Sequence, residues 1–71
     1  MIKMIPVSSS NIVAIGYDAA TLTLQVEFKN AAYQYFDVPL SVYEALMNPP
    51  GGSHGIYLNA NIKGQYREAR L

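Results

Sequence analysis

The sequence predicts an α+β domain in which a three-stranded antiparallel meander packs against two short C-terminal helices. Apolar and polar residues alternate strictly over residues 21–28, which is the period of a strand with one buried face. The loops on either side of this segment are short enough for consecutive strands to form hairpins. After Pro39 the apolar residues follow the spacing of a helix instead.

Two further segments are expected to pair with this central strand. Residues 11–17 and 32–38 are rich in β-branched, aromatic and other apolar residues, which favour strands. A two-residue hairpin at residues 29–30 would place Val26 opposite Tyr33. The expected order is therefore a meander with the central strand in the middle.

The loop between the first two strands sets a second register. A four-residue loop over residues 18–21 would place Tyr17 opposite Leu22. The two loops agree on one core face, and a slip by one residue in either hairpin would turn that strand over. This predicted face comprises Val13, Ile15, Tyr17, Leu22, Leu24, Val26, Phe28, Tyr33 and Tyr35.

The first helix is expected directly after the strands. It begins either at Pro39, whose missing N–H costs nothing in a first turn, or at Ser41, which with Glu44 forms a capping box. It ends near Asn48, before a Pro-Pro pair. Its apolar stripe consists of Val42, Tyr43, Leu46 and Met47.

The second helix is expected to be capped by Ser53 and ended by Gly64. Leu58 and Ile62 lie one turn apart and would face the sheet. The tail, residues 65–71, fits either a helix or an extended segment, and the sequence leaves both open.

Length and composition favour one small domain covering residues 1–71. The chain is too short for two cores, and it has no cysteine, which excludes disulfides, thiolate zinc sites and thiol catalysis. No secretory signal or membrane-length apolar stretch is present, so a cytoplasmic protein without a membrane partner is expected. The net charge is zero and only 14% of residues are charged. A lightly charged surface favours self-association, so a homodimer is one expected form.

Few side chains suit catalysis, and we expect neither an enzyme nor a cofactor or metal site. His54 is the only histidine, and a metal would need several ligands. As a general base, His54 would need an orienting acid and a nucleophile, which the sequence does not supply. Local structural roles account for four of the five carboxylates.

Two segments have features that contact phosphate. The glycine-rich run at residues 51–55 leads into a helix N-terminus, which attracts anions, but it matches no nucleotide-binding motif and also fits a flexible connector. Lys63, Arg67 and Arg70 would share one face if the tail were helical and would form a small positive stripe. The alternative is a solvated terminal face without a ligand.

The other face of the predicted sheet suggests a different function. In the expected register Ile12, Ala14 and Phe36 lie on the face opposite the core. If exposed, such an apolar patch would indicate a protein partner or a dimer interface.

Short motifs are spread over nearly the whole chain. They are Val7-Ser8-Ser9, Gly16-Tyr17-Asp18, Tyr33-x-Tyr35-x-x-Val38-Pro39 and Ser53-x-Gly55-x-Tyr57-x-Asn59-x-x-Ile62. Together they resemble the KTSC domain, a small family named after a C-terminal extension of some lysyl-tRNA synthetases, with free-standing copies in bacteria and phage. The Pro-Pro-Gly-Gly connector departs from the shorter link associated with the family.

The resemblance implies a role near RNA metabolism and supplies no catalytic residues. The leading hypothesis is a non-catalytic RNA-associated module, with tRNA as the implied partner. The alternative is a protein-interaction or self-associating domain that uses Ile12 and Phe36. The residues expected to contact RNA are Lys63, Arg67, Arg70, Ser53, Gly55, Tyr57 and Asn59.

Overall fold

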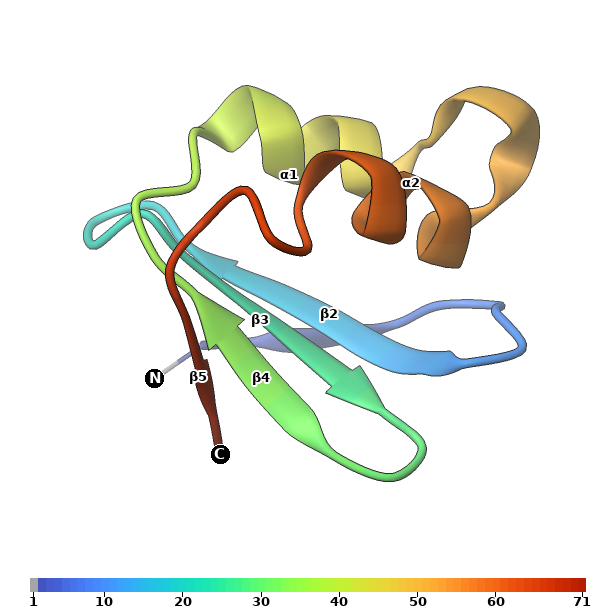
Figure 1. The fold of residues 1–71 in the computed structure, drawn as a ribbon, viewed down its shortest axis with the longest axis horizontal. Helices are drawn as coiled ribbons and strands as arrows, with labels where there is room; N and C mark the ends of the chain where they lie inside the picture. The colour runs from blue at the N-terminus through green and yellow to red at the C-terminus, as the bar shows by residue number, and fades with distance from the viewer. Residues whose placement is uncertain (1) are drawn as a thin grey trace.

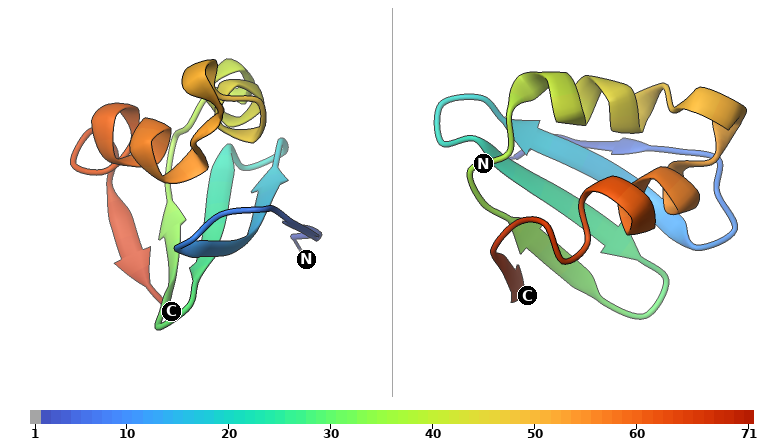
Figure 2. Two further views of the ribbon diagram at one scale, coloured as in Figure 1. Left: turned by 90° about the vertical axis from the view of Figure 1, so that its right-hand side faces the viewer. Right: turned by 45° about the horizontal axis from the view of Figure 1, so that its top comes forward.

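A computed structural model describes residues 2–71 as two layers, an antiparallel sheet and a pair of helices over one of its faces (Figures 1 and 2). Each strand pairs with the next along the chain, in the order β1-β2-β3-β4-β5. The strands are β1 (Met4–Pro6), β2 (Ile12–Asp18), β3 (Thr23–Phe28), β4 (Ala32–Tyr35) and β5 (Glu68–Arg70). The helices are α1 (Leu40–Met47) and α2 (His54–Asn61), with a 3₁₀ turn at Pro50–Gly52 between them. The predicted α+β class with two helices is confirmed, but the sheet has five strands, not three.

The two additional strands lie at the edges of the sheet. β1 pairs with β2, with Met4 opposite Gly16, and β5 pairs with β4, with Glu68 opposite Tyr35. Each has only three residues, too few to show a period of two in the sequence. Pro6 cannot donate to a ladder, which an edge strand tolerates. The tail is therefore extended, which decides between the two alternatives left open above.

The register of the central hairpins agrees in part with the prediction. Val26 lies opposite Tyr33, as predicted. Tyr17 lies opposite Leu24 rather than Leu22, because the four-residue loop is placed one residue later in the chain. Leu22 ends that loop with a φ of 54° and is 42% exposed, so its assignment to the core was wrong. Since the register differs by two residues, the strand keeps its predicted face.

A β-bulge near the start of β2 changes which side chain faces the core. The ladder shifts between Ile12 and Ala14, so Ile12 lies opposite Phe28 and on the same face as Ile15. Ile12 is 1% exposed, whereas Val13 is 41% exposed. The prediction that Val13 faces the core and that Ile12 faces away was therefore wrong.

The ends of the helices follow local chemistry. α1 begins after Pro39, and the capping box expected from Ser41 and Glu44 is not its start. α2 is capped by Ser53, whose hydroxyl accepts a hydrogen bond from the N–H of Ile56 at 3.2 Å. Gly64 follows the helix with a φ of 81°, the left-handed conformation predicted for it.

One hydrophobic cluster joins the helices to the sheet. Both helices contribute to it from their inner faces, which agrees with the predicted helical stripes. The fully buried members are Ile12, Ile15, Leu24, Val26, Tyr35, Val38, Leu46, Leu58 and Ile62. Within residues 2–71 no helix has the length and apolar character needed to cross a bilayer.

Candidate functional site

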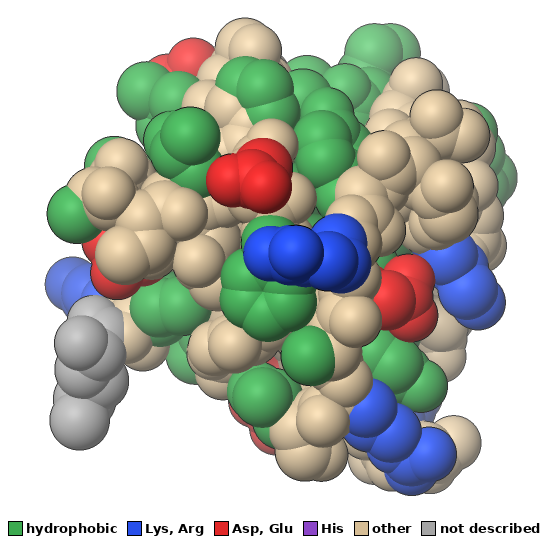
Figure 3. All heavy atoms as spheres, turned by 60° about the vertical axis from the view of Figure 1, so that its left-hand side comes forward, with side chains coloured by type: hydrophobic (Ala, Val, Ile, Leu, Met, Phe, Trp, Pro, Cys, Tyr) green, Lys and Arg blue, Asp and Glu red, His purple; other side chains and the backbone are tan. Residues whose placement is uncertain are grey.

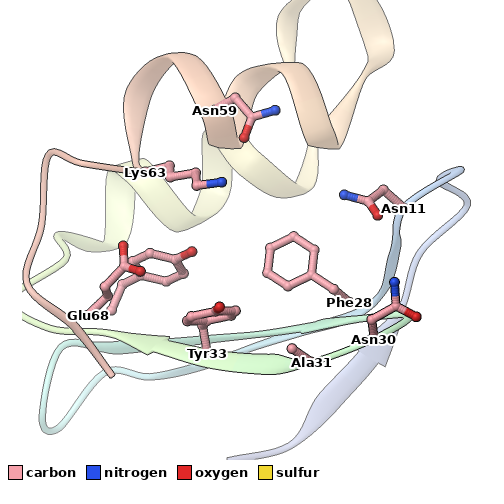
Figure 4. A pocket seen from close by; sticks show the side chains of 9 residues that line it. Asn11, Phe28, Asn30, Ala31, Tyr33, Asn59, Lys63 and Glu68 are labelled. Atoms are coloured by element: carbon pink, nitrogen blue, oxygen red, sulfur yellow. The ribbon is translucent and has the colours of Figure 1, made fainter. Parts of the chain in front are cut away.

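A groove lies between α2 and the part of the sheet formed by β3, β4 and β5 (Figure 4). Its volume is about 220 Å³. The turn from α2 to β5 borders one end, and the β3–β4 loop borders the other (Figure 4). The residues that line it are Asn11, Phe28, Asn30, Ala31, Tyr33, Tyr35, Asn59, Lys63 and Glu68.

The floor of the groove is aromatic. Phe28 and Tyr33 meet edge to face, with ring centroids 5.9 Å apart and planes inclined by 79°. Tyr33 and Tyr35 are two residues apart on β4, so both face the helix side of the sheet, with centroids 6.5 Å apart. Tyr35 is buried, whereas Phe28 and Tyr33 are only half-buried. Two aromatic rings therefore remain accessible from the groove.

The roof of the groove is polar. Asn59 lies on α2 and Lys63 in the turn that follows it, and both are exposed. Their side chains extend into the space above the sheet (Figure 4). Asn11 and Asn30 stand at the opposite end, and an amide side chain both donates and accepts hydrogen bonds. The groove thus combines hydrogen-bonding groups and one cation with an aromatic floor.

A tyrosine and a carboxylate share one end of the groove. Glu68 lies directly opposite Tyr35 in the β4–β5 ladder, on the same face of the sheet. Burial raises the pKa of Tyr35 to about 12, and the negative charge of Glu68 and then Tyr33 add to the effect. Both effects further favour the protonated form of the Tyr35 hydroxyl.

The predicted stripe of Lys63, Arg67 and Arg70 does not form, because the tail is a strand and not a helix. Arg67 lies over the Phe36 ring, with its guanidinium carbon 5.5 Å from the centroid. Arg70 lies opposite Tyr33 on the helix side of the sheet, and only Lys63 lines the groove. On the side of the molecule that Figure 3 draws, basic side chains are separated by acidic, polar and apolar ones, with no continuous positive patch.

The start of α2 does not contribute to the groove. Ser53 is occupied as the helix cap, and Tyr57 packs against the core. A Cβ on Gly55 would meet no atom within 4 Å, so this glycine allows no close approach to the sheet. The His54 ring donates from Nδ1 to the carbonyl of Leu46 at 2.7 Å, which ties α2 to α1. Of the residues predicted to contact RNA, the groove brings together only Asn59 and Lys63.

The predicted interaction patch is absent for a structural reason. The β2 bulge turns Ile12 into the core, so it is no longer available to a partner. Phe36 is half-buried and covered on one side by Arg67. A homodimer stays a prediction, but it loses the surface that suggested it.

The sequence pointed to some lining residues and missed others. Phe28 and Tyr33 were assigned to the core because they lie on the correct face of their strands. The sequence does not show that this end of the hairpin is only partly covered. Asn11 and Asn30 belong to loops that meet at the same end of the sheet, where Lys29 N–H donates to the Asn11 carbonyl at 3.2 Å. A correct β2–β3 register would have placed these loops together.

Among residues 2–71, no three histidine or carboxylate side chains come together as a metal ion would require.

Comparison with known proteins gives one consistent result. The family model described as KTSC domain matches residues 8–66. A lysine–tRNA ligase of Nostoc sp. is 44% identical over 63 residues, covering 87% of this chain and 11% of the ligase. A protein of Tsukamurella paurometabola is 38% identical over 69 residues, covering 96% of this chain and 100% of that protein. The crystal structure of a KTSC domain protein from Yersinia pestis has a TM-score of 0.93 and 32% identity, covering 100% of this chain and 99% of that chain.

Proposed function

The chain belongs to the KTSC domain family, and from this premise we propose that it is a non-catalytic module that binds single-stranded segments of RNA, such as those of a tRNA. Curated relatives that contain a similar region include lysine–tRNA ligases of Nostoc species. The chain spans about a tenth of the length of those ligases. For this reason the proposal takes over only an association with tRNA and not the reaction of the whole enzyme.

One observation carries the proposal, namely that Lys63 lies beside the accessible rings of Phe28 and Tyr33 in one groove. Proteins that bind single strands combine positive charge for the backbone with aromatic rings on which bases stack. Unpaired RNA offers both groups together, because its bases are free to turn out from the strand. The amides at the roof and ends of the groove add hydrogen bonds of either polarity.

The charge of the chain limits how this binding works. With a net charge of zero, long-range attraction to RNA is weak. Each phosphate neutralised on a single strand contributes a slope of about −0.7 in a plot of log affinity against log salt. If only Lys63 and Arg70 reach phosphates, we expect a slope of about −1.4, far shallower than for a basic RNA-binding protein.

A binding role also accounts for the side chains that resemble catalytic groups. The imidazole of His54 is engaged by the Leu46 carbonyl, and burial raises the pKa of Tyr35 further above the neutral range. Neither group is paired with a nucleophile in the groove. We therefore propose that the groove holds its ligand without transforming it.

Titration of labelled tRNA with the intact chain tests the proposal, at about 50 mM and about 200 mM salt. The wild type should bind at low salt, and Lys63→Ala should weaken binding several-fold and flatten the salt slope by about 0.7. Lys3→Ala is the matched control, because Lys3 precedes β1 at the other edge of the sheet and outside the groove. Absence of tRNA binding at low salt would overturn the proposal, as would equal losses in the two variants.

A further inference from the structure

The size of the groove suits a small chemical group. Pockets that enclose drug-sized molecules have volumes of roughly 300–1,000 Å³. At about 220 Å³ this groove is smaller. A single heterocyclic base is of this size, whereas a complete nucleotide or a folded peptide is larger.

The two half-buried rings define how a planar group would lie. Phe28 and Tyr33 are inclined by 79°, so a ligand that stacks on one ring meets the other edge-on. In Figure 4 the Tyr33 ring lies along the floor, with the Phe28 ring standing beside it. A base stacked on Tyr33 would therefore have Phe28 as a side wall and the side chains of Asn59 and Lys63 above it.

The charged groups at one end of the groove determine which edge of a base would face them. Glu68 presents a carboxylate, which only accepts hydrogen bonds when ionised. It would repel a phosphate but accept from an exocyclic amino group, as acidic side chains do with cytosine. Lys63 lines the same groove and has only donors, so its natural partner is a phosphate oxygen.

We propose that the groove binds one unstacked RNA base that carries an exocyclic amino group, stacked on Tyr33, with its amino edge at Glu68 and the adjoining phosphate at Lys63. This inference rests on the proposed function, because it needs an RNA strand as the ligand. It adds a position for the base and a chemical preference that neither the family nor the relatives assign.

Cytosine and uracil provide the cleanest comparison. The two rings have the same size and differ in whether an amino group or a carbonyl oxygen occupies one position. Short oligocytidylate should bind the intact chain at least about fivefold more tightly than oligouridylate, since one specific contact to a base discriminates by about that much or more. Fluorescence anisotropy of end-labelled oligonucleotides at low salt measures both affinities.

Substitution of Glu68 tests the preference directly. Glu68→Gln keeps the size of the side chain but replaces the carboxylate, so the ratio of cytidylate to uridylate affinity should fall towards one. Because Glu68 is exposed, this variant should fold normally.

Substitution of Tyr33 tests the stacking surface. Tyr33→Leu should weaken binding of both oligonucleotides about tenfold, within the range measured for loss of stacking on one base. Tyr57→Leu is the matched control, since Tyr57 is a half-buried tyrosine that packs on the same core but does not line the groove. If Tyr33→Leu fails to fold, the Glu68 variant still decides the question.

The possible failures are distinguishable. Equal binding of the two oligonucleotides, with no effect of Glu68→Gln, would overturn this inference and leave the proposed function standing. Absence of binding to any RNA would overturn both. Binding of cytidine monophosphate without binding of oligocytidylate would show a site for free nucleotides and would overturn the assignment to RNA.

Discussion

The ring of Tyr17 stacks on the ring of Tyr43, with centroids 4.9 Å apart and planes inclined by 12°. This contact joins β2 to α1 across the interface of the two layers. The Tyr17 hydroxyl also donates a hydrogen bond to the carbonyl of Val38, just before the helix. One side chain on the sheet therefore fixes both the position of α1 and the path of the chain into it.

Removal of the Tyr17 hydroxyl should separate these two contributions. Tyr17→Phe keeps the stacked ring but leaves the Val38 carbonyl without its donor, so the free energy of unfolding should fall by about 1 kcal/mol. For a domain of this size that corresponds to a decrease in Tm of about 4–8 °C. Tyr43→Phe is the control, because it keeps the same stacking pair and leaves the Val38 hydrogen bond in place. Equal losses in the two variants, measured by urea unfolding, would contradict this assignment.

The sequence predicted the part of the sheet whose order comes from local signals. The central hairpin was found because residues 21–28 alternate strictly and a two-residue loop allows only one register with their partners. β1 and β5 were missed because three residues carry no period of their own, and their pairing depends on a neighbouring strand already in place. The bulge at Val13 was missed for a related reason, since an extra residue in a strand leaves no mark on composition.

The cap of α2 gives a test with a matched control in the same chain. Ser53→Ala removes the acceptor for the N–H of Ile56 and should destabilise the protein by about 1 kcal/mol. Ser41→Ala removes the serine of the sequence motif S-x-x-E, but Ser41 already lies inside α1 and caps nothing. Its free energy of unfolding should change by less than about 0.5 kcal/mol. A larger loss for Ser41→Ala in thermal unfolding would show that the capping box forms after all.

The site was predictable to a smaller extent than the fold. Asn59 could be identified because it is a polar residue on a helix that otherwise packs on the sheet. Lys63 was identified only as a member of the basic stripe that does not form. Glu68 could not be identified, because its place beside Tyr35 depends on the tail forming a strand. Arg67 and Arg70 lie on different faces for the same reason. Residues three apart point to opposite sides of an extended segment, whereas in a helix they lie near the same face.

Gly16 should be intolerant of any side chain. A Cβ at this position would lie 2.7 Å from the Lys3 carbonyl oxygen and 2.5 Å from Cγ2 of Ile2, so β1 would have to move. Gly16→Ala should cost about 1–3 kcal/mol, with faster amide hydrogen exchange in β1. Gly55→Ala is the control, since its Cβ meets nothing within 4 Å and alanine favours a helix, so stability should rise by up to about 1 kcal/mol. Unchanged stability in Gly16→Ala would mean that β1 is not packed against β2 as described.

The burial of Tyr35 should make the stability of the protein fall at alkaline pH. Its pKa is raised from 10.0 to about 12, mainly by burial and then by Glu68, so the folded chain keeps a proton that the unfolded chain has already released. The stabilisation from the neutral side chain is complete below pH 10 and is lost as the pH rises through about 12, because the unfolded state then binds fewer protons than the native state. The difference in unfolding free energy between wild type and Tyr35→Phe should therefore stay constant up to pH 10. Above pH 10 the wild type should lose stability relative to the variant. All other titrating groups are common to both chains and cancel in that difference. If the difference, measured by urea unfolding, stays constant above pH 10, Tyr35 is not held protonated by the core.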